Sequence, residues 1–206
     1  CIRDRKEGDR LALIEQGFES VLIDLTDSLS IQTGLEAVLK STGGHLDALF
    51  NNAAYGQTGA VEDLSLDALR TQFETNVFGT HELTRLVIPV MRRQGRGRII
   101  QNSSVLGFVA MPYRGAYNAS KFALEGLTDT LRLELRGSGI DVVLIEPGPI
   151  ESRFRETALK QFYAYIDRDA SLHQKAYQKT EEEMGRQDKP VPFSLPPEAV
   201  AKAVFS

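Results

Sequence analysis

The sequence predicts an α/β fold, a doubly wound parallel sheet arranged in three α/β/α layers. Strand-like and helix-like segments alternate along almost the whole chain, and the strand-like segments are uninterrupted apolar runs. Such runs are typical of parallel strands, because helices cover both faces of a parallel sheet. The 206 residues suffice for one domain of this kind with a sizeable core.

Local signals place the elements in chain order. Four apolar runs are expected to be strands, at residues 20–25, 46–50, 98–102 and 140–145. Helices are expected around them, at residues 9–16, 28–41, 65–94, 115–136 and from 196 onward. Ser28 and Ser65 are good N-caps, Gly17 and the turn 137–139 end helices, and Pro89 predicts a kink.

The segment 151–195 breaks this alternation. It is polar and carries scattered aromatic side chains, among them Phe154, Phe162 and Tyr177. We expect a helical substrate lid within a single domain that spans residues 1–206, and an ordinary surface subdomain is the alternative.

Polar and turn-forming residues lie at the ends of the predicted strands. Asp24, Asn51, Ser104 and the pair Pro147-Gly148 hold these positions. In open α/β sheets, ligands bind in the crevice beyond the carboxyl ends of the strands. These residues are therefore expected to line one crevice.

Tyr117 and Lys121 are four residues apart in the predicted helix 115–136, so they share one helix face. A tyrosine has an ordinary pKa near ~10, and a fixed positive charge nearby lowers it. With the hydroxyl of Ser104 close by, this pair could move a proton on or off a carbonyl or alcohol oxygen. Taken alone, the spacing is equally that of a surface tyrosine and a solvated lysine.

The motifs together resemble the short-chain dehydrogenase/reductase family. They are, in order, Asp24-Leu25-Thr26-Asp27, Asn51-Asn52-Ala53-Ala54, Asn76 within Glu74-Thr75-Asn76-Val77-Phe78-Gly79, Ser104 thirteen residues before Tyr117, Lys121, and Pro147-Gly148-Pro149-Ile150. The stretch 115–154 is most similar to the bacterial aldehyde reductase and retinol/steroid dehydrogenase-like branch. The resemblance implies a Rossmann-like domain and an oxidoreductase that acts on CH–OH donors with NAD(P) as acceptor.

The resemblance also implies a role for each matching residue. Tyr117 would be the general acid in carbonyl reduction and the base in alcohol oxidation. Lys121 would lower the pKa of Tyr117 and bind the nicotinamide ribose, and Ser104 would orient the substrate oxygen. Asn76 would hold a water that links Lys121 to solvent. The cofactor-binding set implied by the family is Arg3, Asp24, Asn51, Asn52, Ala53, Tyr117, Lys121, Pro147, Gly148 and Ile150.

Several of these residues also have a purely structural interpretation. Asp24 could cap the turn before Thr26. Asn51 and Asn52 could bridge strands through side-chain hydrogen bonds, and Asn76 could be a tolerated polar residue inside a helix. Jointly, the family pattern favours the functional interpretation.

One part of the family pattern is missing. The family opens with a strand and a glycine-rich turn that seats the cofactor pyrophosphate at a helix N-terminus, and no such turn occurs here. We expect the first strand, the first helix and most of the second strand to precede Cys1, roughly 30 residues by the size of a βαβ unit. This chain expressed alone is expected to fold poorly and to bind cofactor weakly.

The residues near the start of the chain favour NADP(H) over NAD(H). Arg3 stands where the family often places a basic residue for the adenosine 2′-phosphate, and Arg5 and Lys6 add positive charge. An acidic residue at the end of the preceding strand would favour NAD instead.

Charge and composition limit the classes of partner that the protein is expected to bind. A net charge of −4 gives no reason to expect nucleic acid, and no apolar run is long enough to span a bilayer. His45, His81 and His173 lack metal-ligand spacing, so no metal site is expected. The single cysteine fits the cytoplasm. By resemblance we expect a homodimer or homotetramer.

The sequence therefore predicts an NADP(H)-dependent oxidoreductase for an apolar aldehyde, ketone or alcohol, in which Tyr117 is the acid/base. Two alternatives stay open. One is a catalytically silent cofactor-binding regulatory protein of the same fold, and the other is a family member with lyase or epimerase chemistry. The complete set of Asn76, Ser104, Tyr117 and Lys121 disfavours the first, and the lack of a large C-terminal substrate domain disfavours the second.

Overall fold

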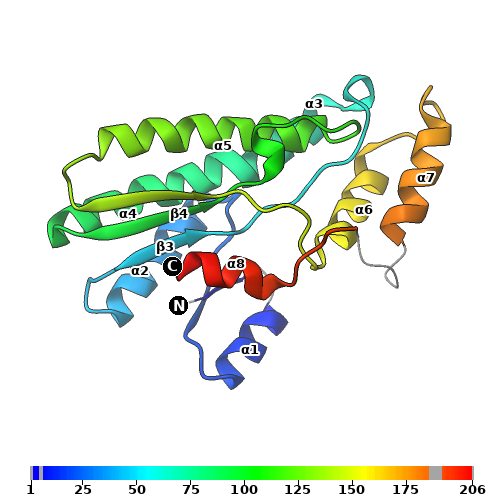
Figure 1. The fold of residues 1–206 in the computed structure, drawn as a ribbon. Coiled ribbons are helices and arrows are strands. Elements are labelled where there is room, and N and C mark those ends of the chain that lie inside the picture. Colours follow the sequence, from blue (N-terminus) through cyan, green and yellow to red (C-terminus); the bar gives the residue numbers. More distant parts are fainter. Residues whose placement is uncertain (1, 5–6, 186–191, 206) are drawn as a thin grey trace.

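The computed structural model describes residues 2–4, 7–185 and 192–205, which form a three-layer α/β/α arrangement (Figure 1). Within these residues the strands make two parallel sheets. The smaller pairs β1 (Ile2–Asp4) with β2 (Ser20–Leu22), and the larger has the order β3 (Ala48–Asn51), β4 (Gly97–Asn102), β5 (Ile140–Ile145). The α/β class and the parallel pairing predicted from the sequence are confirmed.

Helices follow the strands as the alternation predicts. They are α1 (Glu7–Glu15), α2 (Ser28–Ser41), α3 (Leu66–Phe73), α4 (Thr80–Gln94), α5 (Gly115–Glu134), α6 (Phe154–Tyr165), α7 (Gln174–Gly185) and α8 (Pro197–Val204). The helices α4 and α5 run side by side over one face of the larger sheet, and α8 crosses the opposite face (Figure 1).

The main core lies between the sheet and the α2–α4 face. Its buried members include Ile31 of α2, Val87 and Met91 of α4, and Ile99 of β4. On α5, Leu124 is buried and Leu131 packs against the core, but Leu127 is 44% exposed. Leu127 therefore lies on the exposed side of this helix.

Two strands are shorter than their apolar runs, because local side chains take over the backbone hydrogen bonds. The predicted strand 20–25 ends at Leu22, where Asp24 Oδ1 accepts the Thr26 amide at 2.9 Å and starts a turn. At the predicted start of β3, the Gln94 side-chain amide bonds both backbone groups of Leu46, at 2.8 and 3.0 Å.

The caps confirm one prediction and correct another. Ser65 caps α3 and accepts the amide of Ala68 at 3.1 Å. The N-cap of α2 is Asp27 rather than Ser28, because the Asp27 carboxylate accepts the amide of Leu29 at 2.9 Å. Ser28 instead donates to Glu82 of α4.

The single helix predicted over 65–94 is interrupted before Pro89. A π-helical segment, Glu74–Gly79, separates α3 from α4. At its end, a Cβ on Gly79 would collide with the backbone carbonyl of Leu25, so the close packing of this segment requires glycine. Pro89 lies within α4, which continues to Gln94.

At the other end of the sheet, β4 and β5 begin at a pair of glycine turns. Gly97 N donates to Gly139 O at 3.1 Å. Gly139 has a φ of +79°, and a Cβ there would collide with the carbonyl oxygen of Gly95. Both the left-handed backbone and the close approach require glycine at this position.

The segment α6–α7 packs on the loop that follows β3. A second apolar cluster joins Phe162 of α6 and Tyr177 of α7 to Ala60. The Tyr177 hydroxyl accepts the Ala60 amide at 2.8 Å and donates to Asp63. In Figure 1 the two helices stand beside the sheet at one end of the molecule. Among the described helices, none combines the length and the hydropathy that crossing a membrane requires.

Candidate active site

Backbone and side-chain hydrogen bonds tie the carboxyl ends of β3, β4 and β5 together. Ser103 N donates to Ile145 O at 2.7 Å, and Val105 N donates to Pro147 O at 3.1 Å. Asn102 Nδ2 donates to Asn52 Oδ1 at 2.6 Å. The carboxyl ends of β3, β4 and β5 therefore form one edge, whereas Asp24 follows β2 of the smaller sheet.

Tyr117 and Lys121 project from the first two turns of α5 toward this edge. Both are buried, with 9% and 3% of their surface exposed. Lys121 Nζ donates to the backbone oxygen of Asn102 at 2.7 Å and lies 5.7 Å from the centroid of the Tyr117 ring. The short distance and the burial contradict the interpretation of this pair as a surface tyrosine and a solvated lysine.

Ser104 completes the group from the end of β4. Its side chain hydrogen-bonds Tyr117, and its Oγ accepts the amide of Leu106 at 3.1 Å. The bond to Leu106 caps a short 3₁₀ helix, Val105–Gly107, and fixes the direction of the Ser104 hydroxyl. A hydroxyl and a phenol thus meet at one point of the strand edge.

The acid–base properties of this group differ from the expectation in one respect. Burial raises the pKa of Tyr117, and the hydrogen bond from Ser104 and the charge of Arg114 act in the lowering direction. Burial also lowers the pKa of Lys121 to about 8, against a smaller raising effect of Glu125. Lys121 is therefore the weaker cation near Tyr117, because desolvation disfavours its charged form.

Asn76 lies next to this group, and its side-chain amide is hydrogen-bonded within the protein. From the π-helical segment, Asn76 Oδ1 accepts the amide of Tyr55 at 3.2 Å, and Nδ2 donates to Tyr55 O at 2.9 Å and to Ser120 Oγ at 3.2 Å. Asn76 thus joins the loop after β3 to the residue that precedes Lys121.

Asp24 and Asn52 make the hydrogen bonds of their structural interpretations, whereas Asn51, at the end of β3, bonds a helix rather than a strand. Asp24 caps its own turn through Thr26, at 2.9 Å from the backbone amide. Asn51 Nδ2 donates to Thr84 Oγ1 of α4 at 2.9 Å, and Asn52 bridges to β4. These bonds fix the strand ends and leave Asn52 exposed toward solvent.

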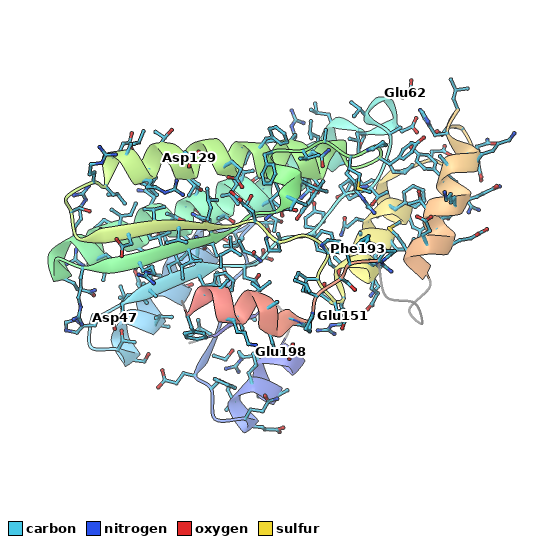
Figure 2. The ribbon with its side chains drawn as sticks, in the orientation of Figure 1. Asp47, Glu62, Asp129, Glu151, Phe193 and Glu198 are labelled. Carbon is cyan, nitrogen blue, oxygen red and sulfur yellow. The ribbon has the colours of Figure 1, made fainter. Side chains whose placement is uncertain are left out.

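The loop after β5 runs beside the same edge. Pro147 is bonded to Val105 through its backbone oxygen, and Gly148 is exposed, with open space where a Cβ would stand. Ile150 pairs with Leu195, so the segment that precedes α8 lies beside the segment that precedes α6. Figure 2 shows Glu151 and Phe193 in this same region, next to the start of α6.

The residues proposed to select NADP lie at the margin of what the structure describes. The backbone of Arg3 belongs to β1. Its side chain, together with Arg5 and Lys6, lies outside the described residues.

The contacts of two residues with Tyr117 were not predicted from the sequence. The ring of Phe154, the first residue of α6, meets the ring of Tyr117 edge to face, with centroids 5.4 Å apart. Arg114 lies three residues before Tyr117, a spacing that places two side chains on one helix face. That spacing was a usable signal for Arg114, whereas the contact of Phe154 depends on tertiary packing.

The strand edge can accept the nicotinamide end of a dinucleotide. Asn102 Oδ1 is buried, and within the described part of the chain no donor reaches it. An acceptor of this kind, beside the Lys121 ammonium and the open backbone of Gly148, suits a ribose hydroxyl or a carboxamide. The residues present therefore fit such a group.

Comparison with known proteins places the chain in a family. Residues 6–163 match the family model described as short chain dehydrogenase. The chain belongs to the short-chain dehydrogenase family. It is 45% identical over 152 residues to the uncharacterized oxidoreductase YbbO of Escherichia coli (strain K12), a match that covers 74% of this chain and 56% of that protein.

Other relatives agree with this family assignment. The human 17-beta-hydroxysteroid dehydrogenase type 1 is 34% identical over 187 residues, with 84% of this chain and 56% of that protein covered. A solved short chain dehydrogenase/reductase from Burkholderia phymatum, in complex with NAD, superposes with a TM-score of 0.81 at 27% identity and covers 98% of this chain and 74% of its own. The chain spans about half the length of the curated relatives it matches. The predicted family and the Rossmann-type fold are confirmed.

Proposed function

We propose that the protein is an NADP(H)-dependent oxidoreductase that interconverts an aldehyde or ketone with the corresponding alcohol. The observation that carries the proposal is the buried group of Tyr117, Ser104 and Lys121 at the carboxyl ends of β4 and β5. In a parallel sheet this edge is where ligands bind. The cofactor supplies the hydride, so the task of the protein is orientation and proton transfer.

In the reducing direction, the Tyr117 hydroxyl donates its proton to the substrate oxygen. Ser104 bonds the phenol and holds the same oxygen in place, which aligns donor and acceptor. Lys121 holds the strand end through Asn102 and offers its remaining N–H donors to the ribose. In the oxidising direction, the ionised phenol accepts the proton of the alcohol.

The preference for NADP(H) rests on the sequence. Arg3 lies in β1 and Arg5 and Lys6 follow that strand in the sequence, which gives three positive charges near the strand that meets the adenosine ribose in this family. A 2′-phosphate is favoured by such charges. The NAD complex of the Burkholderia relative shows that this fold also serves the other cofactor. The ratio of kcat/KM for NADPH over NADH tests the preference, and a ratio below one would contradict it.

The proposed substrate is apolar. The ring of Phe154 packs on Tyr117, and the buried rings of Phe162 and Tyr177 join α6 to α7. We propose that residues 151–195 act as a lid that shields the reacting oxygen from water. A steroid-named relative at 34% identity supports an apolar substrate class.

The decisive variant is Tyr117→Phe, which removes only the hydroxyl. Turnover is expected to fall by ~10²–10⁴-fold, while NADPH affinity, measured by fluorescence titration, stays within about twofold of wild type. Tyr163→Phe is the matched control, because Tyr163 is 58% exposed on α6. Retained turnover in Tyr117→Phe would contradict the mechanism. Loss of NADPH binding by wild type would contradict the whole assignment.

The catalytically silent alternative is separated by the same assay. A regulatory cofactor-binding protein would bind NADPH but show no turnover with any member of an aldehyde and ketone panel. Medium-chain aldehydes, retinoids and steroids are the compounds to include, because each pairs one oxygen with an apolar body.

We also propose a homodimer or homotetramer formed through α4 and α5. On α5, the side chains of Phe122, Leu127 and Leu133 are 47%, 44% and 64% exposed. Apolar side chains on one exposed helix suit an interface between subunits. Light scattering coupled to size-exclusion chromatography measures the molar mass, and a monomer at micromolar concentration would contradict this proposal.

A further inference from the structure

Arg114 is a half-buried cation at the start of α5 that the proposed reaction does not yet use. It precedes the first turn of the helix, and its backbone oxygen accepts the amide of Asn118 at 2.8 Å. Its backbone also pairs with Gly59, and Tyr113 O accepts the Gly59 amide at 3.0 Å. The position of Arg114 is thus fixed by backbone contacts on both sides.

The Arg114 guanidinium joins three parts of the molecule. Nη1 donates to Thr58 Oγ1, in the loop after β3. Nη1 and Nη2 lie 3.9 and 4.0 Å from the sulfur of Met184, in α7. Thr58 and Met184 are both buried. One side chain therefore connects α5, the loop after β3 and the docked helix α7.

Charged groups surround this guanidinium from each neighbouring element. Arg155 of α6 repels it, whereas Tyr117 of α5 and Glu183 of α7 attract it, and burial itself lowers its pKa. On the far side of Tyr117 stand Lys121 and, one turn further, Glu125. An arginine keeps its charge at neutral pH even when it is partly buried, unlike a buried lysine.

The reciprocal effect falls on Tyr117. Burial raises the pKa of the phenol, and the charge of Arg114 acts to lower it. Lys121 is held at the strand end by Asn102, with its own pKa at about 8. Arg114, three positions before Tyr117, thus adds a positive charge to that of Lys121 near the phenol.

We propose that Arg114 is a positioning residue of the acid–base centre, which holds the first turn of α5 against Thr58 and Met184 and keeps a permanent positive charge beside Tyr117. This inference rests on the proposed function of Tyr117. It adds a link between the docking of α7 and proton transfer, because Met184 and Thr58 hold the guanidinium in place.

The test is the pH dependence of kcat for alcohol oxidation in the intact protein. Oxidation needs the ionised phenol, so kcat rises with pH through the pKa of Tyr117. Arg114→Met is expected to move this rise upward by about one pH unit, because it removes the opposite charge. Arg114→Lys keeps a charge and is expected to restore at least half of the shift. Thr58→Val removes only the acceptor and is expected to give a smaller upward shift.

NADPH affinity and thermal melting are measured for each variant, so that a misfolded protein is recognised. A purely structural role of Arg114 would lower kcat at every pH without moving the midpoint, and would overturn the inference. An unshifted midpoint in Thr58→Val would overturn the positioning through Thr58. Should Arg114→Met destroy the fold, the midpoint of Thr58→Val against that of wild type carries the test.

Failure of this inference is distinct from failure of the proposed function. If Tyr117→Phe abolishes turnover and Arg114→Met leaves the midpoint unchanged, Tyr117 keeps its role and Arg114 loses its own. If Tyr117→Phe stays active, both are overturned.

Discussion

The strand-end site and the α6–α7 segment are held in the molecule in different ways. The strand ends are joined by backbone hydrogen bonds between neighbouring loops, such as Ser103 to Ile145, and by the buried ammonium of Lys121. The α6–α7 segment is attached through a small ring cluster and the hydroxyl of Tyr177. The two regions are therefore held by different kinds of contact, and they meet at the ring of Phe154 and at the Arg114 guanidinium, which contacts Met184 of α7.

The largest expected effect concerns the better-anchored region. Lys121→Met is expected to lower kcat by ~10²–10⁴-fold while the fold is retained, because the apolar side chain fills the same buried space. The variant also changes the pH dependence of stability. The native lysine has its pKa lowered to about 8 from 10.5, so the native state loses its proton before the unfolded chain does. In wild type, the free energy of unfolding should then rise with pH between these two values.

Urea denaturation of the intact protein at pH 7.5, 9 and 10.5 measures this slope. Lys121→Met should flatten it by on the order of 2 kcal/mol across the window. Equal slopes in the variant and in wild type would mean that Lys121 is not desolvated as the structure has it.

The attachment of α7 is the next contact to break. Tyr177→Phe leaves the Ala60 amide without its acceptor and removes one of the donors to Asp63, the other being Ser171, a loss of ~1–3 kcal/mol in the docking of the segment. Hydrogen exchange should accelerate in α6 and α7 and stay unchanged in β3, β4 and β5. Uniform acceleration through both regions would contradict the separation drawn above.

Phe154 is one of the residues at which the two regions touch. Phe154→Ala removes the ring that packs on Tyr117, and kcat/KM for an apolar substrate should fall about tenfold, mainly through KM. Tyr163→Ala, on an exposed face of the same helix, serves as the control. An equal loss for a small polar aldehyde would argue against an apolar wall.

The smallest expected effect tests a cap far from the segment. Asp27→Ala should cost ~1 kcal/mol of unfolding free energy, because α2 loses its N-cap. Ser28→Ala should cost less, since Ser28 bonds a side chain on the exposed surface rather than the helix end. Thermal unfolding of both variants decides which residue is the cap.

The elements that could be predicted from the sequence are those that depend on local sequence patterns. The strand 140–145 and the start of α5 at Gly115 were found because apolar runs and turn residues act within a few positions. The convergence of Ser104, Tyr117 and Lys121 was predictable because parallel strands end at one edge. The interruption of the helix at Glu74–Gly79 was not predictable. It depends on close packing against the backbone of Leu25, about fifty residues earlier in the chain.

The electrostatics were the harder part. Spacing alone suggested that Lys121 would tune Tyr117, but the outcome depends on how deeply each cation is buried. Burial is a property of the packed molecule, and it lowers the pKa of both cations. The contact of Phe154 with Tyr117 was equally beyond local pattern, because it depends on how α6 docks.

The glycine turn at Gly139 has a consequence for mutational scanning. It lies at the opposite end of the sheet from Tyr117, yet its left-handed backbone and its contact with Gly95 exclude every side chain. A screen that scores activity alone would therefore rank Gly139 with the acid–base residues. Scoring protein abundance in parallel would separate them, since variants at Gly139 should disappear from both readouts and Tyr117→Phe from only one.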